Sequence, residues 1–226
     1  MDEKQNAFIE LANLFSRHGY RLYLVGGTVR DILLGIPLSD MDAVSDATPD
    51  QMKAFIDGDY TFAKMGSVKI KFKGIKFDIT TMRKEKEYID HRHPGKVEFI
   101  KDIKEDHIRR DFTVNAMYMD DKFKLYDFEN GLDDLNKRIL RMVGDPKKRL
   151  KEDPLRIIRC LRFSLTYHLT IEPSLKNALM SSIIFLNTLS KDKIKMELKK
   201  FDLRKKEQMI KLFDEYSIKH LLDVLE

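Results

Sequence analysis

The stretch YLVGGTVRDILLGIPLSDMDAVSDATP, residues 23–49, joins an apolar run to a glycine pair and then to two closely spaced aspartates. The apolar residues before Gly26 predict a strand, and the residues after Gly27 predict a short helix that ends at Gly35. A second strand is predicted over residues 41–45. The stretch therefore predicts a strand, a glycine turn, a helix and a second strand that carries carboxylates.

The two carboxylates, Asp40 and Asp42, are separated by one residue. Residues at this spacing on a strand point to the same side, where two negative charges repel unless a cation neutralises them. Hard oxygen ligands suit magnesium (Mg2+), and two such metals can clamp the oxygens of an in-line phosphoryl transfer. The pair predicts a metal site, whereas an isolated D-x-D is more often a solvated strand end.

The residues before the aspartates favour the metal reading. Gly26 and Gly27 carry no side chains, so the backbone there can approach a phosphate closely. The helix that follows directs the N–H groups of its first turn to the same place, and Arg30 on that turn can bind a triphosphate. Together with the carboxylates, these residues predict a nucleoside triphosphate site.

Two further strings, RRDFTVNA at 109–116 and EDPLRIIR at 152–159, follow in order. With the first stretch they resemble the motifs of class II tRNA nucleotidyltransferases (CCA-adding enzymes) and bacterial poly(A) polymerases, within the polymerase-beta-like nucleotidyltransferase superfamily. The resemblance spans about residues 20–200. It implies an α+β fold, in which a head with a mixed sheet and helices precedes an all-helical neck.

The pattern of elements agrees with this division. Residues 1–140 mix helix and strand signals, whereas residues 141–226 read as helical, with no strand signal after about residue 128. We therefore expect a catalytic head over 1–140, and over 141–226 a neck that recognises the base and begins the RNA-binding region.

The second motif contributes Arg110 and Asp111. The resemblance implies that they recognise the ribose and support the triphosphate. An aspartate can accept a hydrogen bond from a 2′-hydroxyl, the group that distinguishes ribose from deoxyribose.

The fourth motif contributes Asp153 and Arg156, which are three residues apart on a predicted helix and hence neighbours on its surface. An acceptor beside a donor fork matches the Watson–Crick edges of cytosine and adenine and mismatches those of uracil and guanine. The pair is predicted to select CTP and ATP. Arg159 and Arg162 continue the stripe toward the triphosphate or the RNA. A structural Asp–Arg pair is the alternative.

Residues 83–98 are polar and predict a long mobile loop. They are similar to the flexible loop of the family at Tyr88, Asp90 and Arg92. Relatives that add only the two cytidines lack this loop, so the resemblance implies full CCA addition or addition of A.

Three weaker signals accompany these motifs. Asp78 is a possible third acidic group, and a hairpin over 60–82 with its turn at Lys73 and Gly74 is expected to carry lysines on its outer face. The string at 126–131 is similar to a hinge motif. In the fifth motif, Lys193 replaces a usual arginine and so lacks the planar fork.

Composition sets broad limits. The 226 residues carry a net charge of +5, which permits a polyanionic partner without requiring one. The single cysteine, Cys160, lies among apolar residues and is expected in the core of a protein from a reducing compartment. No signal peptide or membrane span is predicted, so we expect a cytoplasmic protein.

The sequence thus predicts an Mg2+-dependent enzyme that adds CCA to the 3′ end of tRNA from CTP and ATP and releases pyrophosphate. It resembles a short form of the family without the body and tail domains. Addition of A alone, poly(A) synthesis, nucleotide transfer to a small molecule and an inactive RNA-binding module are the alternatives. The sequence leaves the oligomeric state open.

Overall fold

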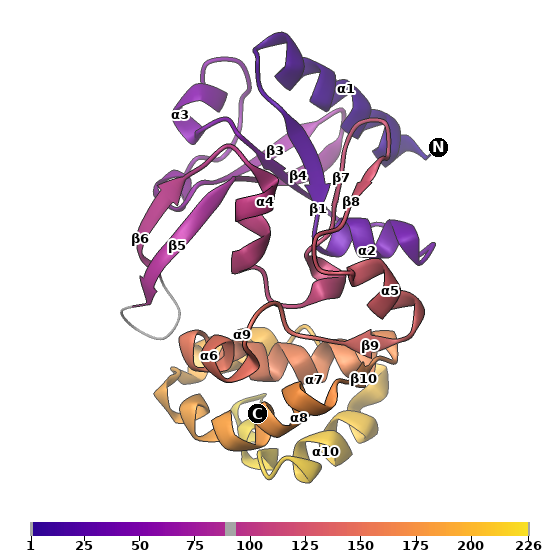
Figure 1. The fold of residues 1–226 in the computed structure, drawn as a ribbon, viewed down its shortest axis with the longest axis vertical. Helices are drawn as coiled ribbons and strands as arrows, with labels where there is room; N and C mark the ends of the chain where they lie inside the picture. The colour runs from indigo at the N-terminus through magenta and orange to yellow at the C-terminus, as the bar shows by residue number, and fades with distance from the viewer. Residues whose placement is uncertain (1, 89–93, 226) are drawn as a thin grey trace. The chain divides into compact units, whose positions relative to one another are not determined.

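The computed structural model describes residues 2–88 and 94–225, which belong to two compact units (Figure 1). The first unit spans residues 1–86 and 96–132, and the second spans 87–95 and 133–226. The first unit contains a mixed sheet with helices, and the second is mainly helical. The predicted α+β fold is therefore confirmed.

The sheet of the first unit has six strands in the order β3-β4-β2-β1-β7-β8. These strands are β1 (Leu22–Val25), β2 (Met41–Ser45), β3 (Ser67–Phe72), β4 (Ile75–Thr81), β7 (Tyr118–Met119) and β8 (Leu125–Tyr126). Only β2 and β4 pair in parallel; the other neighbours are antiparallel. The strand predicted over 41–45 is confirmed, and it occupies an inner position next to both β1 and β4.

Helix α1 (Glu3–Arg17) packs an apolar face into the core of this unit. Phe8, Leu11 and Phe15 lie on that face and are fully buried, as their helical spacing predicts. The helix begins with a capping box in which the Asp2 side chain accepts from the Gln5 N–H. Burial of one face and a satisfied N-terminus explain why this segment is helical.

The remaining helical segments of the first unit are short. They are α2 (Gly27–Leu33), α3 (Pro49–Met52), α4 (Ile103–Asp106), and the 3-10 turns η1 (Ala63–Met65), η2 (His107–Arg109) and η3 (Thr113–Asn115). Helix α3 begins as predicted, with Thr48 as its cap and Pro49 at its first position. Helix α2 follows β1 directly, so its N-terminus lies where that strand ends.

Strands β3 and β4 form the predicted hairpin. Its turn residues Lys73 and Gly74 both have positive φ, 49° and 81°, as a tight hairpin turn requires. Along β3 the side chains alternate: Val68 and Ile70 are buried and Lys69 is exposed. This alternation gives the hairpin one apolar face toward the core and one charged face toward solvent.

The mobile loop expected over 83–98 is wrong for most of that range. Strands β5 (Arg83–Tyr88) and β6 (Pro94–Phe99) form a two-stranded sheet there. Strands are recognised by alternating apolar residues, and this segment has charged residues in their place. These charged residues pair with each other; Arg83, for example, donates to the Glu85 carboxylate at 2.7 Å. Tyr88 is the last residue of β5, and the predicted loop residues at 90 and 92 lie outside the described residues.

The second unit consists mainly of helices. These are α6 (Pro146–Glu152), α7 (Leu155–Tyr167), α8 (Pro173–Ser182), α9 (Lys191–Leu198) and α10 (Lys206–Glu215), with the 3-10 segments η4 (Ile183–Thr188), η5 (Leu203–Lys205) and η6 (Lys219–Leu225). Helix α5 (Gly131–Asn136) lies at the junction of the two units. Cys160 on α7 is fully buried, as predicted.

A short parallel pair corrects the expectation that no strand follows residue 128. Strands β9 (Ile139–Leu140) and β10 (Thr170–Ile171) pair through the register of Ile139 with Thr170. Two-residue strands are too short for an alternating pattern, so the sequence carries no periodic signal for them.

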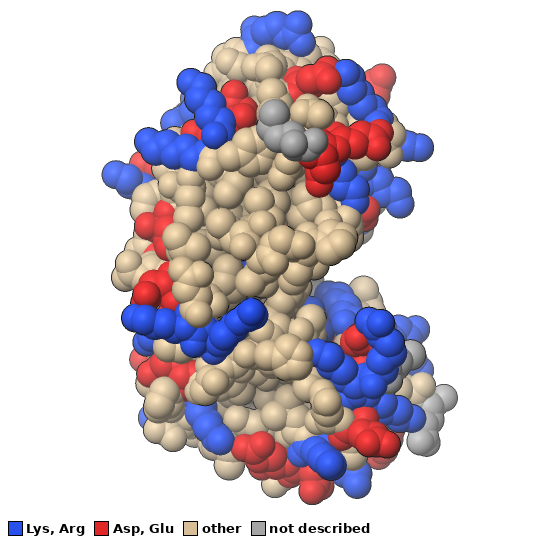
Figure 2. All heavy atoms as spheres, turned by 90° about the vertical axis from the view of Figure 1, so that its right-hand side faces the viewer, with Lys and Arg blue, Asp and Glu red and all other residues tan. Residues whose placement is uncertain are grey.

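On the face shown in Figure 2, Lys and Arg side chains lie among Asp and Glu side chains in both units. The net positive charge does not collect into a single basic surface on that face. None of the helices in the described part of the chain combines the length and the apolar character that crossing a membrane requires.

Candidate active site

Five carboxylates of the first unit line one pocket, and three of them lie on or next to the parallel strands β2 and β4. Asp40 immediately precedes β2, Asp42 is the second residue of β2, and Asp78 on β4 is the register partner of Asp42. The structure thus brings the two predicted carboxylates together and adds the third from the neighbouring parallel strand. The pocket is further lined by Asp57, Gly58, Asp59, Lys69, Ile70, Lys71, Lys76 and Phe77.

The electrostatics of this pocket favour a bound cation. The Asp42 side chain reaches solvent but has protein around most of it, and this loss of hydration, followed by the nearby charge of Asp78, raises its pKa to about 6. Arg110 and Arg30 act in the opposite direction without cancelling the shift. At neutral pH the Asp42 carboxylate is therefore an anion whose charge the surrounding side chains compensate only in part.

The donor set fits a hard divalent cation such as Mg2+. Carboxylate oxygens are its preferred protein ligands, and it is usually held by one or two carboxylates together with substrate phosphates and water. Among the residues that the structure describes, no group of three or more His, Cys, Asp or Glu side chains is arranged as a ready cage for a metal.

The glycine pair lies beside these carboxylates. A Cβ atom added to Gly27 would lie 3.4 Å from Nη2 of Arg30 and 3.6 Å from Oδ2 of Asp42. Gly26 has a φ of 64°. A Cβ atom added to it would lie 3.8 Å from Nη1 of Arg110. The first and second motifs, which are far apart in sequence, therefore meet at the end of β1.

The start of β2 is fixed against helix α2. The Asp42 N–H donates to the Thr28 hydroxyl oxygen at 2.8 Å, and Thr28 is buried. A backbone hydrogen bond to a residue of the first helical turn holds the carboxylate-bearing strand at a set distance from the glycine pair.

Arg30 is buried rather than open to solvent. Its Nη1 donates to Oδ1 of Asn115 at 2.6 Å, and its Nη2 lies 2.8 Å from Asp31. Arg30, which was predicted to bind the triphosphate, is thus held inside the protein next to the glycine pair. The structure therefore fixes a positive charge beside the glycine pair, and a role of Arg30 in binding phosphate stays a prediction.

Asn115 joins the first motif to the second, and the sequence analysis did not include it among the site residues. Besides accepting from Arg30, it donates through Nδ2 to Oδ1 of Asp111 at 3.3 Å. The same Asp111 oxygen accepts from the Phe112 N–H at 2.8 Å. The signal was the asparagine of RRDFTVNA itself, a polar residue between Val114 and Ala116.

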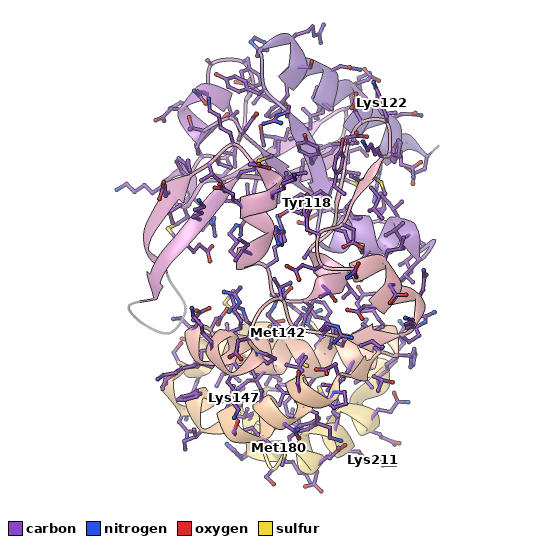
Figure 3. All side chains as sticks on the ribbon, viewed as in Figure 1. Tyr118, Lys122, Met142, Lys147, Met180 and Lys211 are labelled. Carbon is purple, nitrogen blue, oxygen red and sulfur yellow. The ribbon has the colours of Figure 1, made fainter. Side chains whose placement is uncertain are left out.

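Asp106 is a second residue that the sequence analysis missed. It is fully buried and accepts hydrogen bonds from Nε of Arg109 at 2.9 Å, from Nη2 of Arg110 at 2.9 Å and from the Tyr118 hydroxyl at 2.8 Å. It also accepts from the Arg83 N–H at 3.0 Å. Tyr118, labelled in Figure 3, lies on β7 and accepts from Nε of Arg110 at 2.8 Å.

Two guanidinium groups surround the single carboxylate of this network. Burial raises the pKa of the Asp106 carboxyl, but Arg109, Arg110 and the hydrogen bonds outweigh it and hold the pKa far below its usual range. Burial raises the pKa of Tyr118. Arg110 also stacks over the Tyr118 ring, with its guanidinium carbon 4.9 Å from the centroid. Arg110 is therefore held rigidly beside the glycine pair.

The third motif has a steric explanation. A Cβ atom on Gly131 would lie 2.2 Å from the carbonyl oxygen of Thr113, so only glycine fits. The Asp127 carboxylate accepts from the N–H groups of Gly131 and Leu132, each at 2.9 Å. The motif is a tightly packed turn at the end of the first unit.

In the second unit, the structure corrects the placement of Asp153. Helix α6 ends at Glu152, Asp153 has extended backbone angles, and α7 begins at Leu155. Asp153 and Arg156 therefore do not share a helix, because the helical conformation is interrupted at Asp153 and Pro154. The Asp153 carboxylate accepts from the Leu155 N–H at 3.1 Å and so caps the start of α7.

Arg156 and Arg162 both have partners inside the second unit. Arg156 is buried, and its Nη1 donates to the Arg149 carbonyl at 2.8 Å and lies 3.5 Å from Glu152. Nε of Arg162 donates to buried Glu197 of α9 at 3.0 Å. Burial raises the pKa of Glu197, yet nearby cations, Arg159 first, bring it below its usual value.

These contacts give the fourth and fifth motifs a structural role. The Arg162–Glu197 pair ties α7 to α9, and Arg159 and Arg162 lie over the Phe163 ring at 5.4 and 4.2 Å. Lys193 also lies on α9. Whether the arginines of α7 contact nucleotide or RNA stays a prediction.

Three comparisons with known proteins agree with one another. The sequence model of the poly(A) polymerase head domain matches residues 22–141, more than half of the chain. A CCA-adding enzyme of Staphylococcus epidermidis is 42% identical over 183 residues, which are 80% of this chain and 46% of the relative. The chain thus spans about half the length of this relative.

Solved structures resemble the chain over nearly its whole length. The crystal structure of a Bacillus stearothermophilus CCA-adding enzyme in complex with CTP has a TM-score of 0.86 at 29% identity, covering 96% of this chain and 53% of the other. A tRNA nucleotidyltransferase complexed with a primer tRNA and an incoming ATP analog has a TM-score of 0.77 at 28% identity, covering 96% and 62%.

Proposed function

We propose that this chain, which belongs to the poly(A) polymerase head domain family, adds CCA to the 3′ end of tRNA from CTP and ATP. The RNA 3′-hydroxyl attacks the α-phosphate of the nucleotide, and pyrophosphate leaves. The single observation that carries this proposal is the meeting of Asp42 and Asp78 with the glycine pair and Arg110 in one unit. The similarity to CCA-adding enzymes, including one solved with CTP, supports the choice of reaction.

Asp40, Asp42 and Asp78 would hold a divalent cation, for which Mg2+ is our proposal. When bound, it supplies Lewis-acid stabilisation of the negative charge that develops on the phosphates. The carboxylates themselves fix where that charge is met, because Asp42 is anchored through its N–H to Thr28 and Asp78 accepts from the Ser67 hydroxyl at 2.9 Å.

The nucleotide is proposed to bind at the end of β1. Gly26 and Gly27 leave the backbone open to phosphate oxygens, and Arg110 is held beside them by Asp106 and Tyr118. Asp111 is proposed to accept from the ribose hydroxyl, with its position set by Asn115. A prepositioned guanidinium stabilises phosphate charge without reorganising during the reaction.

Selection of cytosine and adenine remains assigned to Asp153 and Arg156. The break between α6 and α7 puts Asp153 at a helix start, where one carboxylate oxygen accepts from the Leu155 N–H. An Asp153→Ala variant that retained full preference for CTP and ATP over UTP and GTP would overturn this assignment. The Ser190 side chain caps α9 by accepting from the Lys193 N–H. A Ser190→Ala variant removes this cap and is a control for the effect of losing a cap alone.

An extension assay tests the function. Purified protein and Mg2+ are mixed with labelled tRNAs that lack CCA, lack only the final A, or are complete, with each nucleotide separately and together. Addition of two cytidines and one adenosine to the first tRNA, followed by arrest, is the expected result. Extension of only the second tRNA by one A would indicate an A-adding enzyme, and long A tails would indicate poly(A) synthesis.

Absence of extension on every tRNA would overturn the proposal and favour a small-molecule acceptor or an inactive RNA-binding module. Loss of the activity in an Asp42→Asn variant checks that the extension belongs to this site rather than to a contaminating enzyme. The buried Cys160 and the cytosolic composition agree with our proposal that the reaction takes place in the cytoplasm.

A further inference from the structure

The pocket of the three carboxylates has a basic wall. Lys69 and Lys71 lie on the exposed side of β3, and Lys76 on β4 is the register partner of Lys71. All three line the pocket together with Asp42 and Asp78, and Lys69 is itself the register partner of Asp78. The outer face of the hairpin, on which these lysines were expected, is therefore a wall of the candidate active site.

These three lysines differ from the fourth lysine of the same hairpin. Lys73 in the turn forms an ion pair with Glu10 of α1 and does not line the pocket. Among the side chains that the structure describes, Lys69, Lys71 and Lys76 form no ion pair, although Lys69 is near enough to Asp59 for their charges to interact. Exposed positive charge that no ion pair holds in place, next to the candidate active site, is suited to a polyanion.

The order of the strands separates this wall from the nucleotide side. In the order β3-β4-β2-β1, β2 carries Asp42, the lysines lie on β4 and β3 to one side, and the glycine pair follows β1 on the other side. An in-line displacement places the attacking and leaving oxygens on opposite sides of the phosphorus. If the triphosphate lies on the side of the glycines and Arg110, the attacking 3′-hydroxyl of the RNA approaches from the side of the lysines.

The spacing of the lysines fits a backbone. Lys69 and Lys71 are two residues apart on an extended strand, roughly 7 Å, so they present successive charges along a line rather than a cluster around one point. The acids Asp57 and Asp59 also line the pocket, so the wall as a whole is not simply basic. A linear anion that follows β3 meets the lysines in succession.

We propose that Lys69, Lys71 and Lys76 bind the backbone phosphates of the single-stranded 3′ end of the RNA acceptor and lead its hydroxyl to the carboxylates. This inference deepens the proposed function and rests on it for the identity of the acceptor. It assigns an RNA-binding role to residues that lie outside every motif identified in the sequence.

Binding measurements on the full chain test this role. The affinity of a labelled single-stranded RNA oligonucleotide ending in CC is measured by fluorescence anisotropy without nucleotide, at several salt concentrations. The K69Q/K71Q/K76Q variant is expected to bind about tenfold more weakly at low salt. Its salt dependence should fall by about 2 in slope, at about 0.7 for each phosphate contact of a single strand. The K73Q variant removes the same type of charge from the same hairpin and is expected to bind like the wild type.

A variant of opposite sign sharpens the test. D57N removes a negative charge from the pocket lining and should tighten RNA binding if the RNA lies along this pocket, whereas RNA bound elsewhere on the surface would be unaffected. Thermal unfolding of each variant shows whether the hairpin remains folded, which is expected because the substituted side chains are exposed.

The outcomes separate this inference from the proposed function. An unchanged RNA affinity with a raised KM for CTP would overturn the inference and assign the lysines to the triphosphate. If the wild type extends no RNA, the proposed function fails, and RNA binding that depends on the three lysines still supports the surface. A wild-type chain that binds no RNA overturns it.

Discussion

Asp42 and Asp106 belong to the same compact unit, but Asp42 is exposed to solvent and Asp106 is fully buried, and their pKa values move in opposite directions. The pKa of Asp42 rises to about 6, with another carboxylate, Asp78, as its register partner. The pKa of Asp106 falls far below its usual range, with two guanidinium groups, a tyrosine hydroxyl and a backbone N–H donating to it.

The contrast shows that the partners of a carboxylate indicate its role. The protein completes the surroundings of Asp106, so its charge serves to hold Arg110 in place. It leaves the charge of Asp42 incompletely compensated, which agrees with the cation site proposed above. Loss of hydration is the first contribution at both sites; the neighbouring charges decide the sign.

Replacing Asp42 by Asn should give the largest effect on activity. We expect nucleotide transfer to fall by roughly 10³-fold or more, the scale for losing a group that stabilises transition-state charge. The fold should persist, because a neutral amide relieves the repulsion with Asp78 and can raise the free energy of unfolding by about 1 kcal/mol, a small value since the side chain reaches solvent. Extension kinetics and thermal unfolding check both parts, and an active Asp42→Asn chain would remove Asp42 from the mechanism.

Replacing Asp106 by Asn should give the largest effect on stability. Arg109 and Arg110 would then face a neutral amide, and breaking a buried pair from one side lowers the free energy of unfolding by about 3–5 kcal/mol. Urea unfolding measures this change. Asp50→Asn, at an exposed position on α3, is the matched control and should change stability by less than about 0.5 kcal/mol. Equal stability of the two variants would contradict the role of Asp106.

The pH dependence separates the two carboxylates further. Asp42 has a folded pKa of about 6, above its ordinary value of 3.8, so it destabilises the cation-free protein progressively as the pH rises from about 4 to 6. Activity should move the other way, since the ionised carboxylate is needed, and kcat/KM should fall about tenfold per pH unit below about pH 6. Raising the Mg2+ concentration should shift this midpoint to lower pH, and a midpoint that ignores the cation would argue against Asp42 as its ligand.

Replacing Thr28 by Val should give the smallest effect, because it removes one hydrogen bond from the positioning of Asp42. The Asp42 N–H would lose its acceptor, lowering the free energy of unfolding by about 1 kcal/mol and activity by about tenfold. Thr48→Ala removes a helix cap of similar energy away from the site and should lower stability without lowering kcat/KM. Equal activity losses in the two variants would mean that Thr28 acts through stability alone.

The sequence predicted the parts of this site that depend on local pattern. The strand at 41–45, the helix after the glycine pair and the hairpin turn at Lys73 and Gly74 follow from alternation, glycines and caps, and all are present. The pairing of Asp42 with Asp78 and the pocket position of Lys69 depend on the register of strands distant in sequence, which no local pattern encodes.

Three predictions failed for identifiable reasons. Strands β9 and β10 have two residues each, too few for an alternating pattern. Strands β5 and β6 are rich in charge, so they lack the apolar period by which strands are recognised. Asp153 and Arg156 have helical spacing, but Pro154 interrupts the helix between them. Asp106 was missed because a single buried acid among charged residues has no sequence pattern, and its role follows only from its partners.

The parallel pairing of β2 with β4 has a consequence for how the molecule forms. Asp42 and Asp78 become neighbours only after the intervening segment, which includes α3 and β3, has closed into a loop. Closing such non-local contacts is slow compared with forming helices and hairpins. The site is thus a late product of folding: a growing chain can hold α1 and the β3–β4 hairpin before it has any place to bind a cation. A divalent ion that binds only the folded carboxylate pair would stabilise the completed sheet against unfolding.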